Sequence, residues 1–196
     1  MNYYLLGINE NSRKWKGCLN IDPFLLNECH EEIHPVDLVE RWGCIRGQLF
    51  YRILADGAAS PVTSIGSQFL AFAADIVSVE NLQCPDVQFL PLTSLDGRKT
   101  YLMMRVLVEV DCIDWQLSTV DPWPAEHVCE SWQSEHGRFF IKPIARKDKI
   151  PSGADVFFLG GWKDAFNIVV SERFKAEVLS LDFDHDFLSF ELLGLV

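Results

Sequence analysis

The C-terminal stretch, residues 155–196, most constrains the fold, because short apolar runs alternate there with turn residues. Runs at 156–159 and 166–170 are rich in β-branched and aromatic residues, and a Gly-Gly pair separates them. A third run at 187–193 closes the chain as a mostly buried strand. Runs of this length and composition predict β-strands joined by turns.

The clearest helix of the sequence lies between the second and third runs. Ser171 stands where an N-cap is expected, and Glu172 follows at the positive end of the helix. Phe174, Val178 and Leu181 then recur at helical spacing and form one apolar stripe.

A weaker copy of this unit is predicted earlier in the chain. Ser67 could cap a helix striped by Phe69, Ala73 and Ile76, and a strand at 87–92 follows it. This strand resembles the one at 188–193 in its pattern of apolar residues. A duplicated helix-strand unit is therefore one interpretation, and chance similarity between such units is the other.

The remaining patterns complete the expected architecture. Strands are predicted at 3–8, 49–54, 101–110 and 138–142, with a hairpin across Asp96-Gly97. Asp22-Pro23 is typical of a helix start, so helices are expected from there to about residue 34 and at 36–42. These elements predict an α+β fold with a mostly antiparallel sheet and short helices. We expect one domain over 1–196, with 1–60 as an N-terminal lobe.

Composition limits the classes of partner and the compartment. Apolar residues make up 48% of the chain, enough for a sizeable core, yet no apolar run could span a bilayer. The first residues lack the features of a signal peptide, and the six cysteines form no CxxC pair, so a cytoplasmic protein with reduced thiols is expected. The net charge of −11 disfavours nucleic acid and favours either a basic protein partner or simple solubility.

One enzymatic motif is present. His30, Glu31 and His34 match H-E-x-x-H, which on a helix would bind zinc through both imidazoles, with Glu31 as general base. Pro35 follows His34 directly, which places the second histidine at a helix end. A polar helix end facing water is the competing interpretation.

Candidate interaction residues lie in two other segments. Asp182, Asp184 and Asp186 lack the glycine and glutamate of a calcium loop and indicate a solvated turn, which could also contact a basic partner. Trp123 and Trp132 lie in a loop region and could anchor an interface, or else fill the core.

Several of these segments resemble one known family. The chain is similar to the immunity proteins of bacterial polymorphic-toxin systems in four segments. These are residues 86–92, the strand at 101–110, the segment 111–115 with Ser118, and residues 169–175 before the C-terminal strand. The family is the myxobacterial immunity type, formerly a domain of unknown function. The resemblance covers roughly residues 65–193, and Ile65-Gly66-Ser67 replaces the family's valine-serine start.

The resemblance implies a role without catalysis. A member binds a co-encoded toxin in the cytoplasm and blocks it, with no catalytic residues and no cofactor; a homodimer is left open. Two alternatives are kept. One is a zinc-dependent hydrolase that uses His30, Glu31 and His34, and the other is an immunity enzyme that reverses the toxin's modification.

Overall fold

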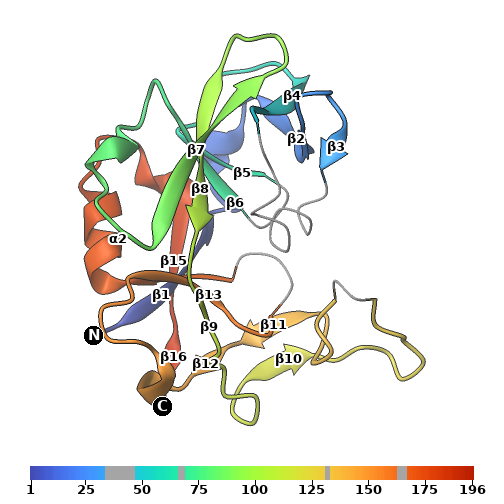
Figure 1. The fold of residues 1–196 in the computed structure, drawn as a ribbon, viewed down its shortest axis with the longest axis vertical. Coiled ribbons are helices and arrows are strands. Elements are labelled where there is room, and N and C mark those ends of the chain that lie inside the picture. Colours follow the sequence, from blue (N-terminus) through green and yellow to red (C-terminus); the bar gives the residue numbers. More distant parts are fainter. Residues whose placement is uncertain (34–46, 66–68, 131–132, 163–166) are drawn as a thin grey trace.

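The computed structural model describes residues 1–33, 47–65, 69–130, 133–162 and 167–196 (Figure 1). Strands predominate among them, and α2 (Glu172–Leu179) is the one α-helix in these ranges. The fold is thus a largely sheet α+β fold, as the sequence predicts. The expected helix at 36–42 lies outside the described residues. Short 3-10 turns complete the helical structure: η1 (Arg13–Trp15), η2 (Val79–Asn81), η3 (Lys147–Lys149) and η4 (His185–Phe187).

The larger sheet has seven strands in the order β3-β2-β4-β7-β8-β6-β5. All neighbours are antiparallel except β4 and β7. The strands are β2 (Asn20–Leu26), β3 (Glu32–Ile33), β4 (Leu49–Ala55), β5 (Val62–Ile65), β6 (Phe69–Ala73), β7 (Val87–Ser94) and β8 (Thr100–Val106). The hairpin expected at Asp96-Gly97 is confirmed, because β7 and β8 pair across it. Gly97 takes a φ of 69°, which glycine adopts without a Cβ penalty.

The larger sheet curls on itself, and a separate core fills the inside of the curl. β2 and β5 contact each other although they lie near opposite ends of the strand order. Tyr51 and Tyr101 are fully buried there, with ring centroids 5.7 Å apart in an edge-to-face arrangement. Both hydroxyls donate to backbone carbonyls, of Lys99 and Ser60 respectively, so neither is buried without a partner.

The smaller sheet has five strands in the order β15-β1-β14-β13-β9. These are β1 (Tyr3–Ile8), β9 (Glu109–Val110), β13 (Val156–Leu159), β14 (Ile168–Ser171) and β15 (Leu188–Leu192). Two short parallel strands, β12 (Ile144–Ala145) and β16 (Gly194–Leu195), continue from this sheet. Ala145 of β12 also bridges Ile113, just beyond β9. The two ends of the smaller sheet are therefore linked, and its inner core includes Phe157, Val169 and Leu193.

A third core joins the two sheets. It combines Leu70, Phe72 and Met104 of the larger sheet with Leu6 and Val170 of the smaller sheet. Helix α2 adds Phe174 and Val178 to this core, which confirms the predicted stripe. Residues 1–60 are divided between both sheets, since β1 belongs to the smaller and β2–β4 to the larger.

Two predicted helices are wrong. Phe69–Ala73 forms β6, and all five of its side chains are buried. A strand buried on both faces is apolar without alternation, so its pattern imitates a helical stripe. The described residues therefore give no support to a duplicated helix-strand unit.

The segment after Asp22-Pro23 is strand β2 rather than a helix. Its pairing with β4 shifts register between Ile21 and Leu25, and the Asp22 carboxylate accepts the N–H of Phe24 within the irregularity. Proline lacks an N–H donor, so it is tolerated at such a break in the ladder.

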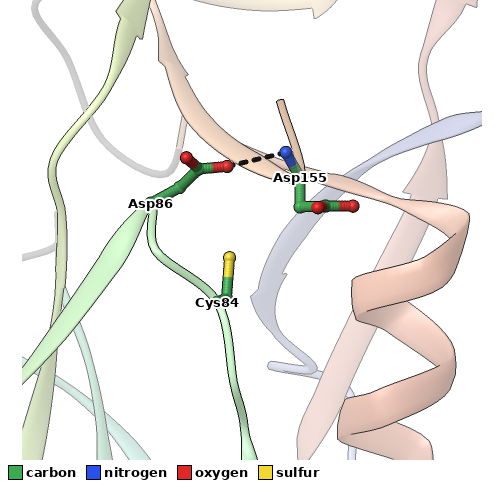
Figure 2. Close-up of side chains that lie close together, drawn as sticks. All are labelled: Cys84, Asp86 and Asp155. Carbon is green, nitrogen blue, oxygen red and sulfur yellow. Dashed lines mark hydrogen bonds between the residues drawn. The ribbon is translucent and has the colours of Figure 1, made fainter. Parts of the chain in front are cut away.

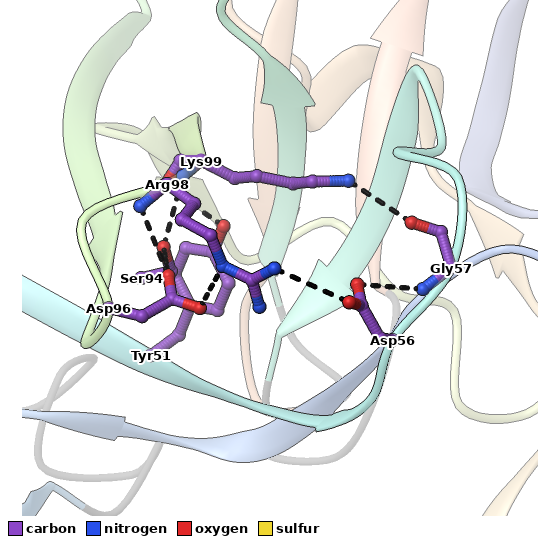
Figure 3. A network of polar contacts seen from close by, with 7 residues as sticks. All are labelled: Tyr51, Asp56, Gly57, Ser94, Asp96, Arg98 and Lys99. Carbon is purple, nitrogen blue, oxygen red and sulfur yellow. Dashed lines mark hydrogen bonds and ion pairs between the residues drawn. The ribbon is translucent and has the colours of Figure 1, made fainter.

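A polar network closes one end of the larger sheet (Figure 3). The Arg98 guanidinium contacts the carboxylates of Asp96 and Asp56, and Lys99 donates to the carbonyl of Gly57. The hydrogen bond from Ser94, followed by those from Arg98, lowers the pKa of Asp96 to about 2. The hairpin tip is thereby tied to the loop after β4. No helix in the described ranges is both long and apolar enough to cross a membrane.

Candidate interaction surface

Strands β10 (Thr119–Asp121) and β11 (Phe139–Lys142) pair with each other, and with the loop between them they project from the rest of the molecule (Figure 1). We call residues 114–142 the arm. Its base is fixed by Ser118, whose hydroxyl accepts the N–H of Ile144 at 2.9 Å and donates to the Ile144 carbonyl at 3.2 Å. Asp114 turns the chain into the arm by accepting the N–H groups of Gln116 and Leu117.

A ladder of stacked rings anchors the arm to the smaller sheet. Trp115 stacks on His136 at 3.5 Å between centroids and on Phe140 at 5.7 Å. Phe140 in turn stacks on Trp162 at 3.7 Å, and Trp162 is buried in the core of the smaller sheet. Aromatic pairs of this kind add stability beyond the area that they bury. The base of the arm is therefore a packed structure.

The outer part of the arm is held mainly by polar contacts. Trp123 donates its indole N–H to the Ser134 carbonyl at 2.7 Å and stacks on His127. Arg138 forms an ion pair with Asp121 across the two strands. Trp123, one of the predicted interface anchors, is thus half-buried and shapes the arm from within. Trp132 lies outside the described residues.

The arm presents apolar side chains to solvent at its two-stranded sheet. Phe139 is 53% exposed and Ile141 is 59% exposed. Thr119 pairs with Lys142 and Val120 with Phe140, so Ile141 is the extra residue of a β-bulge. Bulges redirect a side chain at the expense of ladder hydrogen bonds and often occur next to functional sites. Val128, 83% exposed, adds a third apolar group in the loop.

The same arm carries negative charge. Glu126, Glu130 and Glu135 are exposed, and none of the three forms an ion pair with another described residue. An arm that carries both exposed apolar groups and exposed carboxylates is suited to a partner that offers apolar groups and cations.

The predicted acidic turn at 182–186 is less available to a basic partner than the carboxylates of the arm. Asp182, Asp184 and Asp186 are exposed, but Lys14 forms ion pairs with both Asp184 and Asp186. The Lys14 hydrogen bond is also the main cause of a lowered pKa at Asp184. Lys14 therefore offsets one negative charge of this turn and holds the Asp184 and Asp186 carboxylates in place.

The H-E-x-x-H segment lacks the helical geometry that a zinc site of this type needs. Residues 27–30 form a turn, His30 has a φ of 62°, and β3 begins at Glu32. The Glu31 carboxylate accepts a hydrogen bond from Asn27. Because the segment turns and then enters a strand, His30 and Glu31 do not share a helical face. His34 lies outside the described residues.

A buried polar cluster lies where the two sheets meet (Figure 2). Donor atoms of Cys84, Asp86 and Asp155 lie within 4.8 Å of one another, a spacing that could hold a metal ion. The carboxylate of Asp86 accepts the N–H groups of Asp155 and Val156, while that of Asp155 accepts hydrogen bonds from Ser171 and Arg173.

These contacts favour a structural role for the cluster. Burial raises the pKa of the Cys84 thiol to about 11, so the thiol is protonated near neutral pH. A metal ion would have to displace Arg173 from Asp155 and deprotonate Cys84. As it stands, the cluster fastens the start of β7 to β13 and α2.

Comparison with protein-family models and with curated protein sequences finds no match to this chain. The segments that carry the resemblance to immunity proteins have structural roles here. Cys112 is fully buried, Asp114 and Ser118 form the base of the arm, and Trp115 belongs to the ring ladder.

Phe139 and Ile141 are interaction candidates that the sequence reading missed. It identified 138–142 as a strand, and the three consecutive apolar residues of that run were the available signal. A run without alternation does not show which side chains a neighbouring element covers.

Proposed function

We propose that this protein is an immunity-type protein that binds a cognate bacterial toxin in the cytoplasm and neutralises it by occlusion, with the arm as its contact surface. The observation that carries the proposal is the exposure of Phe139 and Ile141 on a strand that a stacked aromatic ladder holds in place. Rigid, exposed apolar groups bind a partner with little loss of side-chain freedom.

Charge supports a basic partner. The chain has a net charge of −11, and Glu126, Glu130 and Glu135 lie on the same arm and form no ion pair with another described residue. Complementary charge accelerates encounter, whereas buried apolar anchors slow dissociation. The proposal needs no bond-making centre in the chain.

The resemblance of residues 86–118 and 169–193 to immunity proteins is the second support. The toxin would be encoded by a neighbouring gene. In the described part of the H-E-x-x-H motif, residues 30–33, the chain is turn and strand rather than the helix that a zinc hydrolase of this type requires, so we favour the binding role.

The test is protection of bacteria that co-express this chain and the product of the adjacent toxin gene. Phe139→Asp and Ile141→Asp should each weaken the purified complex by at least about tenfold, since truncating a hot-spot residue costs ~2 kcal/mol or more and tenfold corresponds to about 1.4 kcal/mol. Leu54→Asp is the matched control, because Leu54 is 59% exposed in the larger sheet, far from the arm in the chain. Equal protection by all three variants would refute the arm as the contact surface.

A further inference from the structure

Among the described residues, β15 (Leu188–Leu192) forms one edge of the smaller sheet, with no strand beyond it. Asn9 donates to the Phe187 carbonyl and Leu193 to the Tyr3 carbonyl, so the odd-numbered residues of this strand bond to β1. The N–H and C=O groups of the even-numbered residues therefore point away from β1. Within the described part of the chain, no strand pairs with this outer edge between Leu188 and Leu192.

The free edge is a short window with defined ends. At one end, the N–H of Leu188 already donates to His185 in η4. At the other end, β12 pairs with Gly194 and Leu195. Both groups of Phe190, the carbonyl of Leu188 and the N–H of Leu192 remain available to a new strand.

The side chains of this edge offer little protection against pairing. Leu192 is 62% exposed, and the edge has no proline or lysine, which commonly block such pairing. Leu188, Phe190 and Leu192 lie on the face that packs towards α2, where Lys175 sits over the rings of Tyr4 and Phe190. Glu191, the one charged residue of β15, points to the opposite face.

We propose that two copies of this chain associate through β15 in an antiparallel register centred on Phe190. In this register Phe190 exchanges two hydrogen bonds with its symmetry mate, and each Leu192 N–H donates to the Leu188 carbonyl of the other copy. Leu192 lies opposite Leu188, and Glu191 lies opposite Ser189.

Side-chain charge and the number of free backbone N–H donors favour this register over the two registers shifted by one residue. A shift that centres the pairing on Glu191 would place two glutamates directly opposite each other, which is destabilising. A shift that centres it on Ser189 would pair Phe190 with Leu188 and leave Phe190 as the one donor of each copy, because the Leu188 N–H is already donated to His185, whereas the register centred on Phe190 uses the N–H groups of both Phe190 and Leu192. A second copy therefore fits the edge in one register, and its symmetry gives a closed dimer.

Sedimentation velocity of the full chain over a wide concentration range tests the proposal. The wild type should show a reversible monomer–dimer equilibrium. Leu192→Pro removes only an outward N–H, so the fold should persist while the dimer dissociation constant rises at least tenfold. Leu192→Ala, which keeps the N–H, should weaken the dimer less.

Two charged substitutions of Ser189, which lies opposite Glu191 of the other copy, test the register without a proline substitution. Ser189→Lys places a cation opposite Glu191 of the other copy and should tighten the dimer, whereas Ser189→Glu should weaken it. A wild-type chain that stays monomeric throughout overturns the proposal. A dimer that responds equally to both Ser189 variants, or not at all to Leu192→Pro, also overturns it.

Discussion

Replacing Arg173 with methionine should destabilise the fold more than the loss of an exposed ion pair. Arg173 pairs with Asp155, whose side chain is only 5% exposed, while the Arg173 side chain is 52% exposed. Ser171 donates to the same carboxylate. Methionine keeps much of the aliphatic length but leaves the Asp155 charge buried, with Ser171 as its remaining side-chain donor.

The expected loss in the free energy of unfolding lies between two limits. Removing one partner of a fully buried pair costs about 3–5 kcal/mol, because an uncompensated charge remains. Exposed pairs contribute only about 0.2–1 kcal/mol. Since the Asp155 side chain is buried but the Arg173 side chain is half exposed, we expect a loss of about 2–3 kcal/mol in the free energy of unfolding.

Urea denaturation of the wild type, Arg173→Met, Asp155→Asn and the double variant would measure the coupling. Burial raises the pKa of Asp155, but hydrogen bonds from Arg173 and Ser171 outweigh it, so the folded pKa is lowered. A carboxyl with a lowered pKa stabilises the fold above its unfolded pKa, and this contribution is lost as pH falls through the folded pKa. The difference between wild type and Arg173→Met should therefore shrink as the solution becomes acidic.

A loss below about 0.5 kcal/mol near neutral pH would refute the reasoning, since it would place the pair among ordinary surface contacts. A difference that grows with acidity would refute it as well. The Asp155→Asn background should make Arg173→Met much less costly, because no buried charge is then left.

The other predictions concern the junction between the sheets and the arm. Asp86→Ala leaves the N–H groups of Asp155 and Val156 without their acceptor and should cost about 2–4 kcal/mol in urea denaturation, with Asp86→Asn less costly because its carbonyl can still accept. Ser118→Ala removes both contacts to Ile144, so amide hydrogen exchange should accelerate in 114–142 while β6 and β8 keep their protection. Gly137→Ala would bring a Cβ within 2.5 Å of the Asp121 carbonyl, and the resulting displacement of the arm should lower stability by about 1–3 kcal/mol and weaken toxin binding together.

The elements that the sequence predicts correctly are those specified by a short run of adjacent residues. Ser171 caps α2 by accepting the N–H of Phe174, and an N-cap serine before an apolar stripe is a short-range pattern. The β7–β8 hairpin follows from an Asp-Gly turn between two apolar runs. β6 was misread because burial on both faces removes the alternation that marks a strand.

The candidate surface depended on contacts between distant residues. The Asp182–Asp186 turn is charged in the sequence, yet Lys14, far away in the chain, forms ion pairs with Asp184 and Asp186. Phe140 and Ile141 are neighbours of similar apolar character, but Trp162 covers the first ring and leaves the second side chain in solvent.

Sequence by itself determined the positions of strands such as β1, β7 and β13, the one described helix and the acidic net charge, because propensity, capping and charge are properties of adjacent residues. Tertiary structure decided which apolar groups stay exposed, which carboxylates are neutralised and which strand edge is left open. These properties depend on which segments meet in space, and no short stretch of chain specifies its distant neighbours.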